Sequence, residues 1–196
     1  MLLSGRGSNM SAIADCIADG RLRGAEIAVV ISNVAGAPGL AAAEQRGLNI
    51  ITIESQGRKR AEHDAEVCQA LKSHGVELVI LAGYMRLLSP GFIQAFPQRI
   101  LNIHPSLLPA FPGLDAQHQA FDYGVKIAGC TVHFVDEQLD HGVIILQRAV
   151  PVHETDDAQT LSTRILAEEH IAYSDAIARV LSGDYRIGGR RYVPKQ

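Results

Sequence analysis

The first half of the chain alternates short runs of β-branched residues with longer stretches rich in Ala and Glu. This alternation is typical of βαβ units, which build a parallel sheet covered by helices on both faces. Each helical stretch ends at a glycine, which easily adopts the left-handed conformation of a helix C-cap. The pattern predicts strands over 26–32, 49–53, 78–82 and 99–103, and helices over 9–19, 38–46 and 58–74 that end at Gly20, Gly47 and Gly75.

The second half of the chain has a different pattern, in which two long strand-like runs lie on either side of a short acidic loop. These runs, 126–135 and 142–152, predict a pair of strands. A long helix is expected over 157–181. We expect it to begin with Thr155 and the two aspartates that follow, because these residues suit a positive helix N-terminus. The tail, 184–194, predicts a closing hairpin.

Composition and charge limit the class of protein. A chain of 196 residues, 47% of them hydrophobic, is long enough for one sizeable core, so we expect a single domain over 1–196. The net charge of -3, with acids and bases mixed, argues against a nucleic-acid partner. No apolar stretch approaches the roughly 20 residues that cross a bilayer, and the N-terminus does not resemble a signal peptide. We therefore expect a soluble, cytoplasmic protein without a membrane partner.

The first candidate site is the glycine-rich segment Ser4–Asn9, which opens an amphipathic helix. Glycines let the backbone turn tightly and expose its N–H groups, and the helix dipole adds positive potential, so the segment predicts a phosphate site. It matches neither the P-loop nor the dinucleotide GxGxxG pattern. The alternative interpretation is a simple turn with Ser8 or Asn9 as the helix cap. Because only residues 1–3 precede it, either the first strand is short or the natural start lies upstream.

The second candidate site is the pair Asn102 and His104, which comes directly after a strand-like run. Residues two apart on a strand face the same side, and ligands collect beyond the carboxyl ends of strands in open α/β sheets. An amide and an imidazole are suited to stabilising an oxyanion and moving a proton near neutral pH. The alternative interpretation is a capping Asn and a structural His in a proline-rich turn.

The third candidate is Asp140, in the acidic loop between the two long strand-like runs. A carboxylate brought beside His104 would favour the imidazolium and relay a proton. Spacing alone does not show that the two loops meet, and an ordinary turn residue is the alternative interpretation.

A metal site is not expected. The plausible ligands are His104, His118, His133, Asp140 and His141, but no two of these histidines have HxxxH or HxH spacing. His133 lies inside a predicted strand, where it faces either the core or the active-site crevice. The cysteines at positions 16, 68 and 130 are far apart and lack a CxxC pair, which predicts buried, reduced thiols.

Six segments of the chain match a known family in order: SGRGSNMSAI, VVISN, VILAGYMRLLSP, LNIHPSLLPAFPG, GCTVHFVDEQLDHGVIILQ and AEEH. They resemble those of the glycinamide ribonucleotide formyltransferases, the folate-dependent enzymes of purine synthesis. The resemblance implies an α/β, Rossmann-like formyltransferase fold: a mostly parallel central sheet with helices on both faces and an antiparallel extension. It assigns 1–100 to a phosphate-substrate half and 101–196 to a folate and catalytic half.

The resemblance also implies a reaction. The formyl group of the co-substrate 10-formyltetrahydrofolate passes to the amine of glycinamide ribonucleotide, which attacks it directly, giving formylglycinamide ribonucleotide and tetrahydrofolate. The catalytic trio of the family falls on Asn102, His104 and Asp140. The first two would hold the oxyanion, and Asp140 would pair with His104 and assist proton transfer.

The binding residues of the family can be carried over in the same way. The substrate phosphate falls on Gly7, Ser8 and Asn9, and the ribose or amine contact on Glu169, for which a structural carboxylate is the alternative. The folate pocket falls on Met85, Arg86, Leu87, Leu88, Val135, Asp136 and Glu137, with Arg60 facing the glutamate tail. An apolar core for the Leu/Met stretch and a surface cation for Arg60 are the alternatives. The resemblance requires no metal or nucleotide cofactor, and we expect small-molecule partners and a monomer or homodimer.

Formyltetrahydrofolate hydrolase is the second functional hypothesis, because it shares Asn-x-His and the aspartate. It typically shows a His-His-Ser run, whereas this chain has HPSLLP. Methionyl-tRNA and sugar formyltransferases share the trio too, but the tRNA enzyme has a further C-terminal domain and a basic surface. A non-catalytic folate or nucleotide binder would not need the trio. The sequence departs from the usual family pattern at 113–120 and 141–143.

Overall fold

The computed structural model describes residues 1–195 and divides after Asn102 into two compact units. The first unit contains five strands that pair in parallel in the order β3-β2-β1-β4-β5. Strands β1, β2 and β4 are buried along their whole length and are apolar except for Ser32, as expected for the inner strands of a parallel sheet. The five strands are β1 (Leu2–Leu3), β2 (Val30–Ser32), β3 (Ile50–Thr52), β4 (Val79–Leu81) and β5 (Ile100–His104).

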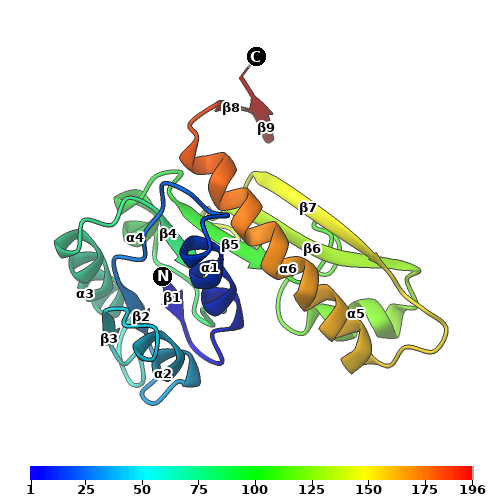
Figure 1. Ribbon diagram of the computed structural model, residues 1–196, viewed down its shortest axis with the longest axis horizontal. Helices are drawn as coiled ribbons and strands as arrows, with labels where there is room; N and C mark the ends of the chain where they lie inside the picture. The colour runs from blue at the N-terminus through cyan, green and yellow to red at the C-terminus, as the bar shows by residue number, and fades with distance from the viewer. Residues whose placement is uncertain (196) are drawn as a thin grey trace. The chain divides into compact units, whose positions relative to one another are not determined.

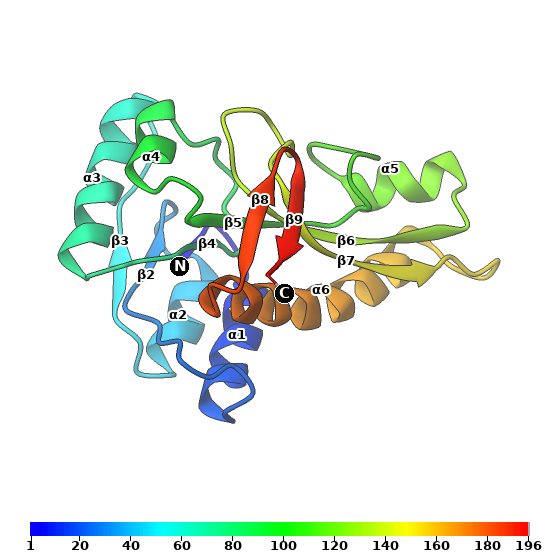
Figure 2. The same cartoon turned by 90° about the horizontal axis from the view of Figure 1, so that it is seen from above.

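Four helices cover the sheet of the first unit, α1 and α2 on one face and α3 and α4 on the other (Figure 2). Right-handed crossovers require this division, because the strand order runs one way from β1 to β3 and the other way from β3 to β5. The order therefore reverses between β1 and β4, and ligands commonly bind at such a switch point in α/β sheets. The helices are α1 (Ser8–Ala18), α2 (Pro38–Glu44), α3 (Arg60–Ser73) and α4 (Pro90–Ala95).

The second unit is built around an antiparallel pair, β6 and β7, with one long helix, α6, packed against both strands (Figure 1). A short antiparallel hairpin, β8 and β9, joins this pair through a parallel contact between β7 and β9. The α6 side chains that face the strands include Leu161, Ile165 and Tyr173, all fully buried. The elements are α5 (Ala116–Tyr123), β6 (Ile127–Phe134), β7 (Ile144–Pro151), α6 (Ala158–Leu181), β8 (Tyr185–Gly188) and β9 (Arg191–Pro194).

The predicted α/β fold, with a parallel sheet and an antiparallel extension, is confirmed, and so are the glycine helix ends and the closing hairpin. The strand predicted over 26–32 is too long, because only Val30–Ser32 are strand. Its neighbour β1 is two residues long and pairs with just Ile31 and Ser32, so the ladder ends early. The boundary after Asn102 lies near the predicted division at 100, and the single-domain assignment stays a prediction.

The structure refines one helix prediction and adds two short helices. Of the three residues expected to begin α6, Asp157 is the N-cap, and its carboxylate accepts the N–H of Thr160 at 2.7 Å. The short helices α4 and α5 were not predicted. A signal for α4 was present in Ser89-Pro90, because Ser89 caps the helix and a proline at the first helical position needs no N–H acceptor. None of the helices in residues 1–195 is long and apolar enough to span a bilayer.

The cysteines are free and buried, as predicted. Burial raises the pKa of the Cys130 thiol to about 12, and Cys130 has no exposed surface. We expect a maleimide at pH 8 to modify Cys130 only when the second unit unfolds, because the thiolate is the reactive form. Peptide mass mapping of folded and urea-unfolded protein measures this. Complete labelling of Cys130 within minutes in the folded protein would contradict the buried assignment.

Candidate active site

Strand β5 carries the first two members of the predicted trio. Asn102 and His104 leave the strand on the same side, because Ile103 between them faces the opposite way. Asn102 is the register partner of Leu81 on the parallel strand β4, and His104 is the last residue of β5. Both side chains therefore lie at the carboxyl end of a parallel strand, as the sequence predicts.

The His104 ring is buried and faces an oxygen acceptor at each nitrogen. Its Nε2 lies 2.8 Å from the backbone oxygen of Phe111, and its Nδ1 lies 3.4 Å from Oδ2 of Asp140. A neutral imidazole has only one N–H, whereas both acceptors are matched when both nitrogens carry protons. Both ring nitrogens of His104 therefore face oxygen atoms, one from the loop after β5 and the other from Asp140.

Asp140 occupies the loop between β6 and β7 with a left-handed backbone conformation, φ 49°. Its side chain is 9% exposed, and its Oδ2 accepts the N–H of Gly113 at 2.8 Å. Asp140 is thus a turn residue, as the alternative interpretation holds, but its carboxylate is buried beside His104 instead of pointing to solvent. The structure shows that the two loops meet, a point that the spacing in the sequence left open.

His133 is a further member of this cluster, and its role was open from the sequence. It lies at an irregularity in the pairing of β6 with β7, and its Nε2 is 3.9 Å from Oδ1 of Asp140. Its Nδ1 lies 2.7 Å from the backbone oxygen of Phe134 and donates a hydrogen bond to it. Burial lowers the pKa of His133, outweighing the Phe134 carbonyl and the Asp140 carboxylate, which act in the opposite direction. His133 is therefore a neutral neighbour of Asp140.

The loops around the cluster are fixed by backbone contacts. Thr131 on β6 holds the loop after β5, because its hydroxyl donates to the Ser106 carbonyl at 2.7 Å and accepts the Leu108 N–H at 3.0 Å. Gly142 fixes the other loop: a Cβ at this position would lie 1.7 Å from the backbone oxygen of Phe134. Only glycine allows the chain to pass so close to β6 two residues after Asp140.

The glycine-rich segment of the first unit has a clear local structure. Gly7, with φ 73°, is the N-cap residue of α1, so the alternative in which Ser8 or Asn9 caps the helix is wrong. The N-cap residue, a glycine, makes no side-chain capping bond to α1. A Cβ on Gly7 would lie 2.8 Å from the Cα of Gly39, so the segment is packed closely against the start of α2.

The residues assigned to the folate pocket lie in one segment of each unit. In the first unit Met85 and Leu87 are 72% and 53% exposed while Leu88 is buried, so an ordinary core explains Leu88 but not the other two. Arg86 donates from its guanidinium to the backbone oxygen of Arg58 at 3.3 Å. Arg60 is exposed at the start of α3.

In the second unit, the segment Val135–Glu137 follows β6 directly. Asp136 ties this loop together, because its Oδ2 lies 2.8 Å from Nδ1 of His141 and its Oδ1 accepts the Gln138 N–H. Glu169 is buried on α6, a place that fits both the substrate contact and the structural carboxylate.

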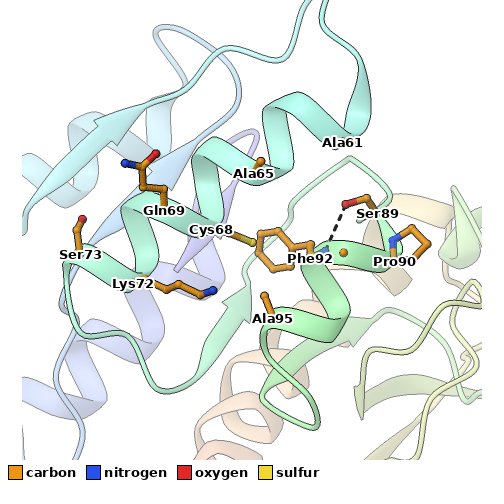
Figure 3. Close-up of a pocket in the computed structure, with 11 residues that line it drawn as sticks. Ala61, Ala65, Cys68, Gln69, Lys72, Ser73, Ser89, Pro90, Phe92 and Ala95 are labelled. Atoms are coloured by element: carbon orange, nitrogen blue, oxygen red, sulfur yellow. Dashed lines mark hydrogen bonds between the residues drawn. The ribbon is translucent and has the colours of Figure 1, made fainter.

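A hollow of about 790 Å³ lies between α3 and α4, lined by small side chains and by Phe92, Cys68 and Lys72 (Figure 3). None of the residues predicted for the site lines it. Across residues 1–195, no three His, Cys, Asp or Glu side chains are arranged to hold a metal ion.

Comparison with known proteins identifies the family. The family model described as formyl transferase matches residues 1–177, and the chain belongs to this family. Phosphoribosylglycinamide formyltransferase of Escherichia coli (strain K12) is 40% identical over 184 residues, 93% of this chain and 86% of that protein. The trifunctional purine biosynthetic protein adenosine-3 of Drosophila pseudoobscura pseudoobscura is 46% identical over 95% of this chain, which spans only 14% of that relative's length.

Solved structures show the same fold. Glycinamide ribonucleotide transformylase 1 from Symbiobacterium toebii matches with a TM-score of 0.96 and 50% identity, covering 100% of this chain and 92% of that one. A formyltetrahydrofolate deformylase from Pseudomonas syringae pv. tomato str. DC3000 matches with a TM-score of 0.91 at 26% identity, and this chain covers 65% of it. The formyltransferase fold and the resemblance stated from the sequence are confirmed.

The lowered pKa of His133 predicts a pH dependence of stability. The folded state binds this proton less tightly than the unfolded chain, whose histidine pKa is about 6.5, so the free energy of unfolding should fall as pH drops below 6.5. Urea unfolding of wild type and His133→Asn at pH 7.5 and 5.5 measures the effect, and we expect a smaller loss in the variant. His118→Asn, at an exposed histidine on α5, is the control. Equal losses in wild type and His133→Asn would contradict the assignment.

The close approach at Gly142 predicts that Gly142→Ala displaces the Asp140 loop. We expect a loss of about 1–3 kcal/mol in the free energy of unfolding, typical of overpacking, and a fall of about 100-fold in formyl-transfer turnover. Gly91→Ala in α4 is the matched control, because nothing lies within 4 Å of its added Cβ. Steady-state kinetics and thermal unfolding of both variants test this, and wild-type turnover in Gly142→Ala would show that the loop tolerates the methyl group.

Proposed function

We propose that the chain transfers the formyl group of 10-formyltetrahydrofolate to the amine of glycinamide ribonucleotide, a step of de novo purine synthesis. The observation that carries the proposal is the buried pair of His104 and Asp140, 3.4 Å apart, with Asn102 two residues before His104 on β5. The names of the relatives from Escherichia coli and Symbiobacterium toebii support the choice of substrate.

In this proposal the folate supplies an activated formyl group, and the amine nitrogen attacks its carbon. The bond between that carbon and N10 then breaks, so that the amine loses one proton and N10 gains one. Asn102 and His104, the latter as an imidazolium, donate hydrogen bonds to the oxygen that becomes negative in the transition state. Asp140 holds His104 in that form and assists the transfer of the amine proton through water.

Binding is assigned to the segments that the resemblance names. The N-terminus of α1, at Gly7, Ser8 and Asn9, would hold the substrate phosphate through backbone N–H groups. Glu169 would contact the ribose or the amine. The backbone of 85–88 and of 135–137 would bind the pterin, and Arg60 would face the glutamate tail. This chemistry needs small-molecule substrates and no metal.

The first experiment follows deformylation of 10-formyl-5,8-dideazafolate by absorbance, with and without glycinamide ribonucleotide. We expect turnover that requires the amine and falls by about 10²–10⁴-fold in Asp140→Asn, the usual range for loss of acid–base assistance. Asp122→Asn, an exposed carboxylate on α5, is the matched control and should retain wild-type turnover.

The same assay separates the second candidate function, hydrolysis of formyltetrahydrofolate, which the similarity to the Pseudomonas syringae deformylase favours. Turnover that does not depend on glycinamide ribonucleotide would make the chain a hydrolase and would remove the reason to place a phosphate at α1. Absence of turnover under both conditions, in a protein that binds the folate, would support a non-catalytic binder.

A further inference from the structure

The two loops that leave the switch point of the first unit are joined to each other. Ser4 is the first residue after β1, and residues 82–89 form the loop after β4. The Ser4 N–H donates to the Gly83 carbonyl at 3.0 Å, and the Met85 N–H donates to the Ser4 hydroxyl at 2.8 Å. One residue thus ties the start of the proposed phosphate segment to the start of the proposed folate segment.

The Ser4 hydroxyl is itself fixed in direction. Because the Met85 N–H is only a donor, the hydroxyl oxygen accepts there, and its own proton is donated to Oδ1 of Asn33 at 2.5 Å. Asn33 is buried, and its Nδ2 donates to the Ser55 hydroxyl at 3.0 Å. The bonds form one chain from Met85 through Ser4 and Asn33 to Ser55, in which each bond polarises the next.

The phosphate segment is equally fixed on its other side. The Gly39 N–H donates to the Gly5 carbonyl at 2.9 Å, and Gly7 packs against the Gly39 backbone. Ser4 immediately precedes this segment and links it directly to Met85. Met85 itself is 72% exposed, and its N–H is held by the Ser4 hydroxyl.

We propose that Ser4 is a positioning residue that couples the two substrate sites, so that phosphoribosyl substrate bound at α1 strengthens the binding of folate at 85–88, and the reverse. The inference rests on the proposed function. It requires no movement of the fold, because a ligand bound at one end of this chain of hydrogen bonds polarises the bonds that lead to the other end. By thermodynamic linkage the two ligands strengthen each other by the same factor.

The test is calorimetric titration with 5,8-dideazafolate, which lacks a formyl group to transfer, in the absence and presence of saturating glycinamide ribonucleotide. In the wild type we expect the substrate to tighten folate binding about fivefold or more, the lower end of usual coupling between sites. In Ser4→Ala we expect that ratio to fall to about 1, because Met85 loses its acceptor and Asn33 its donor. Ser73→Ala, whose hydroxyl bonds only within the end of α3 and to His74, is the matched control.

A second measurement separates coupling from a general loosening of the fold. Amide exchange at Met85 should slow when glycinamide ribonucleotide alone is added to wild type, and should not respond in Ser4→Ala. If Ser4→Ala does not fold, Ser4→Cys provides the same comparison, because a thiol is a weak donor and acceptor of similar size.

The outcomes separate the inference from the proposed function. If wild type binds both ligands with a ratio of 1, or if Ser4→Ala keeps the wild-type ratio, the coupling is absent and the proposed function is untouched. If wild type binds neither ligand, the proposed function itself fails. A uniform loss of both affinities in Ser4→Ala with an unchanged ratio would assign Ser4 a structural role only.

Discussion

A buried carboxylate is stable only when its oxygens have partners, and the arrangement around Asp140 satisfies this requirement. One oxygen accepts the Gly113 N–H and faces His104, and the other faces His133. These partners come from three separate places: the end of β5, the turn after it and the irregular end of β6. Three features bring the carboxylate to this position: the paths of both loops, the glycine at 142 and the left-handed backbone at Asp140.

The two histidines beside Asp140 differ because their surroundings differ. His104 faces an oxygen acceptor at each ring nitrogen, whereas His133 has one N–H directed at the Phe134 carbonyl and a pKa that burial lowers. A single carboxylate therefore stands between two imidazoles with different partners. The division of roles depends on which backbone carbonyls lie near each ring, a feature that residue type alone does not determine.

Much of the fold follows from local features of the sequence. Glycines at 20, 47 and 75 end helices because these positions need a positive φ, and β-branched runs form the inner strands. The length of β2 did not follow, because it depends on how many residues β1 offers for pairing. The helices α4 and α5 were missed because short helices carry too few turns to show a periodicity.

The candidate site likewise combines features that follow from local sequence with contacts between residues far apart in the chain. The sequence placed Asn102 and His104 on one side of a strand, since alternation is a local rule. The pairing of His104 with Asp140 and the bond from Met85 to Ser4 join residues 36 and 81 positions apart, and no local pattern encodes them. The sequence shows that Asp140, His104 and Ser4 are polar. Their partners depend on which distant segments of the chain fold back against them.

The exposed loop after β4 has one more consequence. Met85 and Leu87 point outward, while the Met85 N–H is held by the Ser4 hydroxyl and its backbone path is fixed. A ligand that binds to this segment contacts main-chain groups. The positions of these groups do not depend on which side chains point outward.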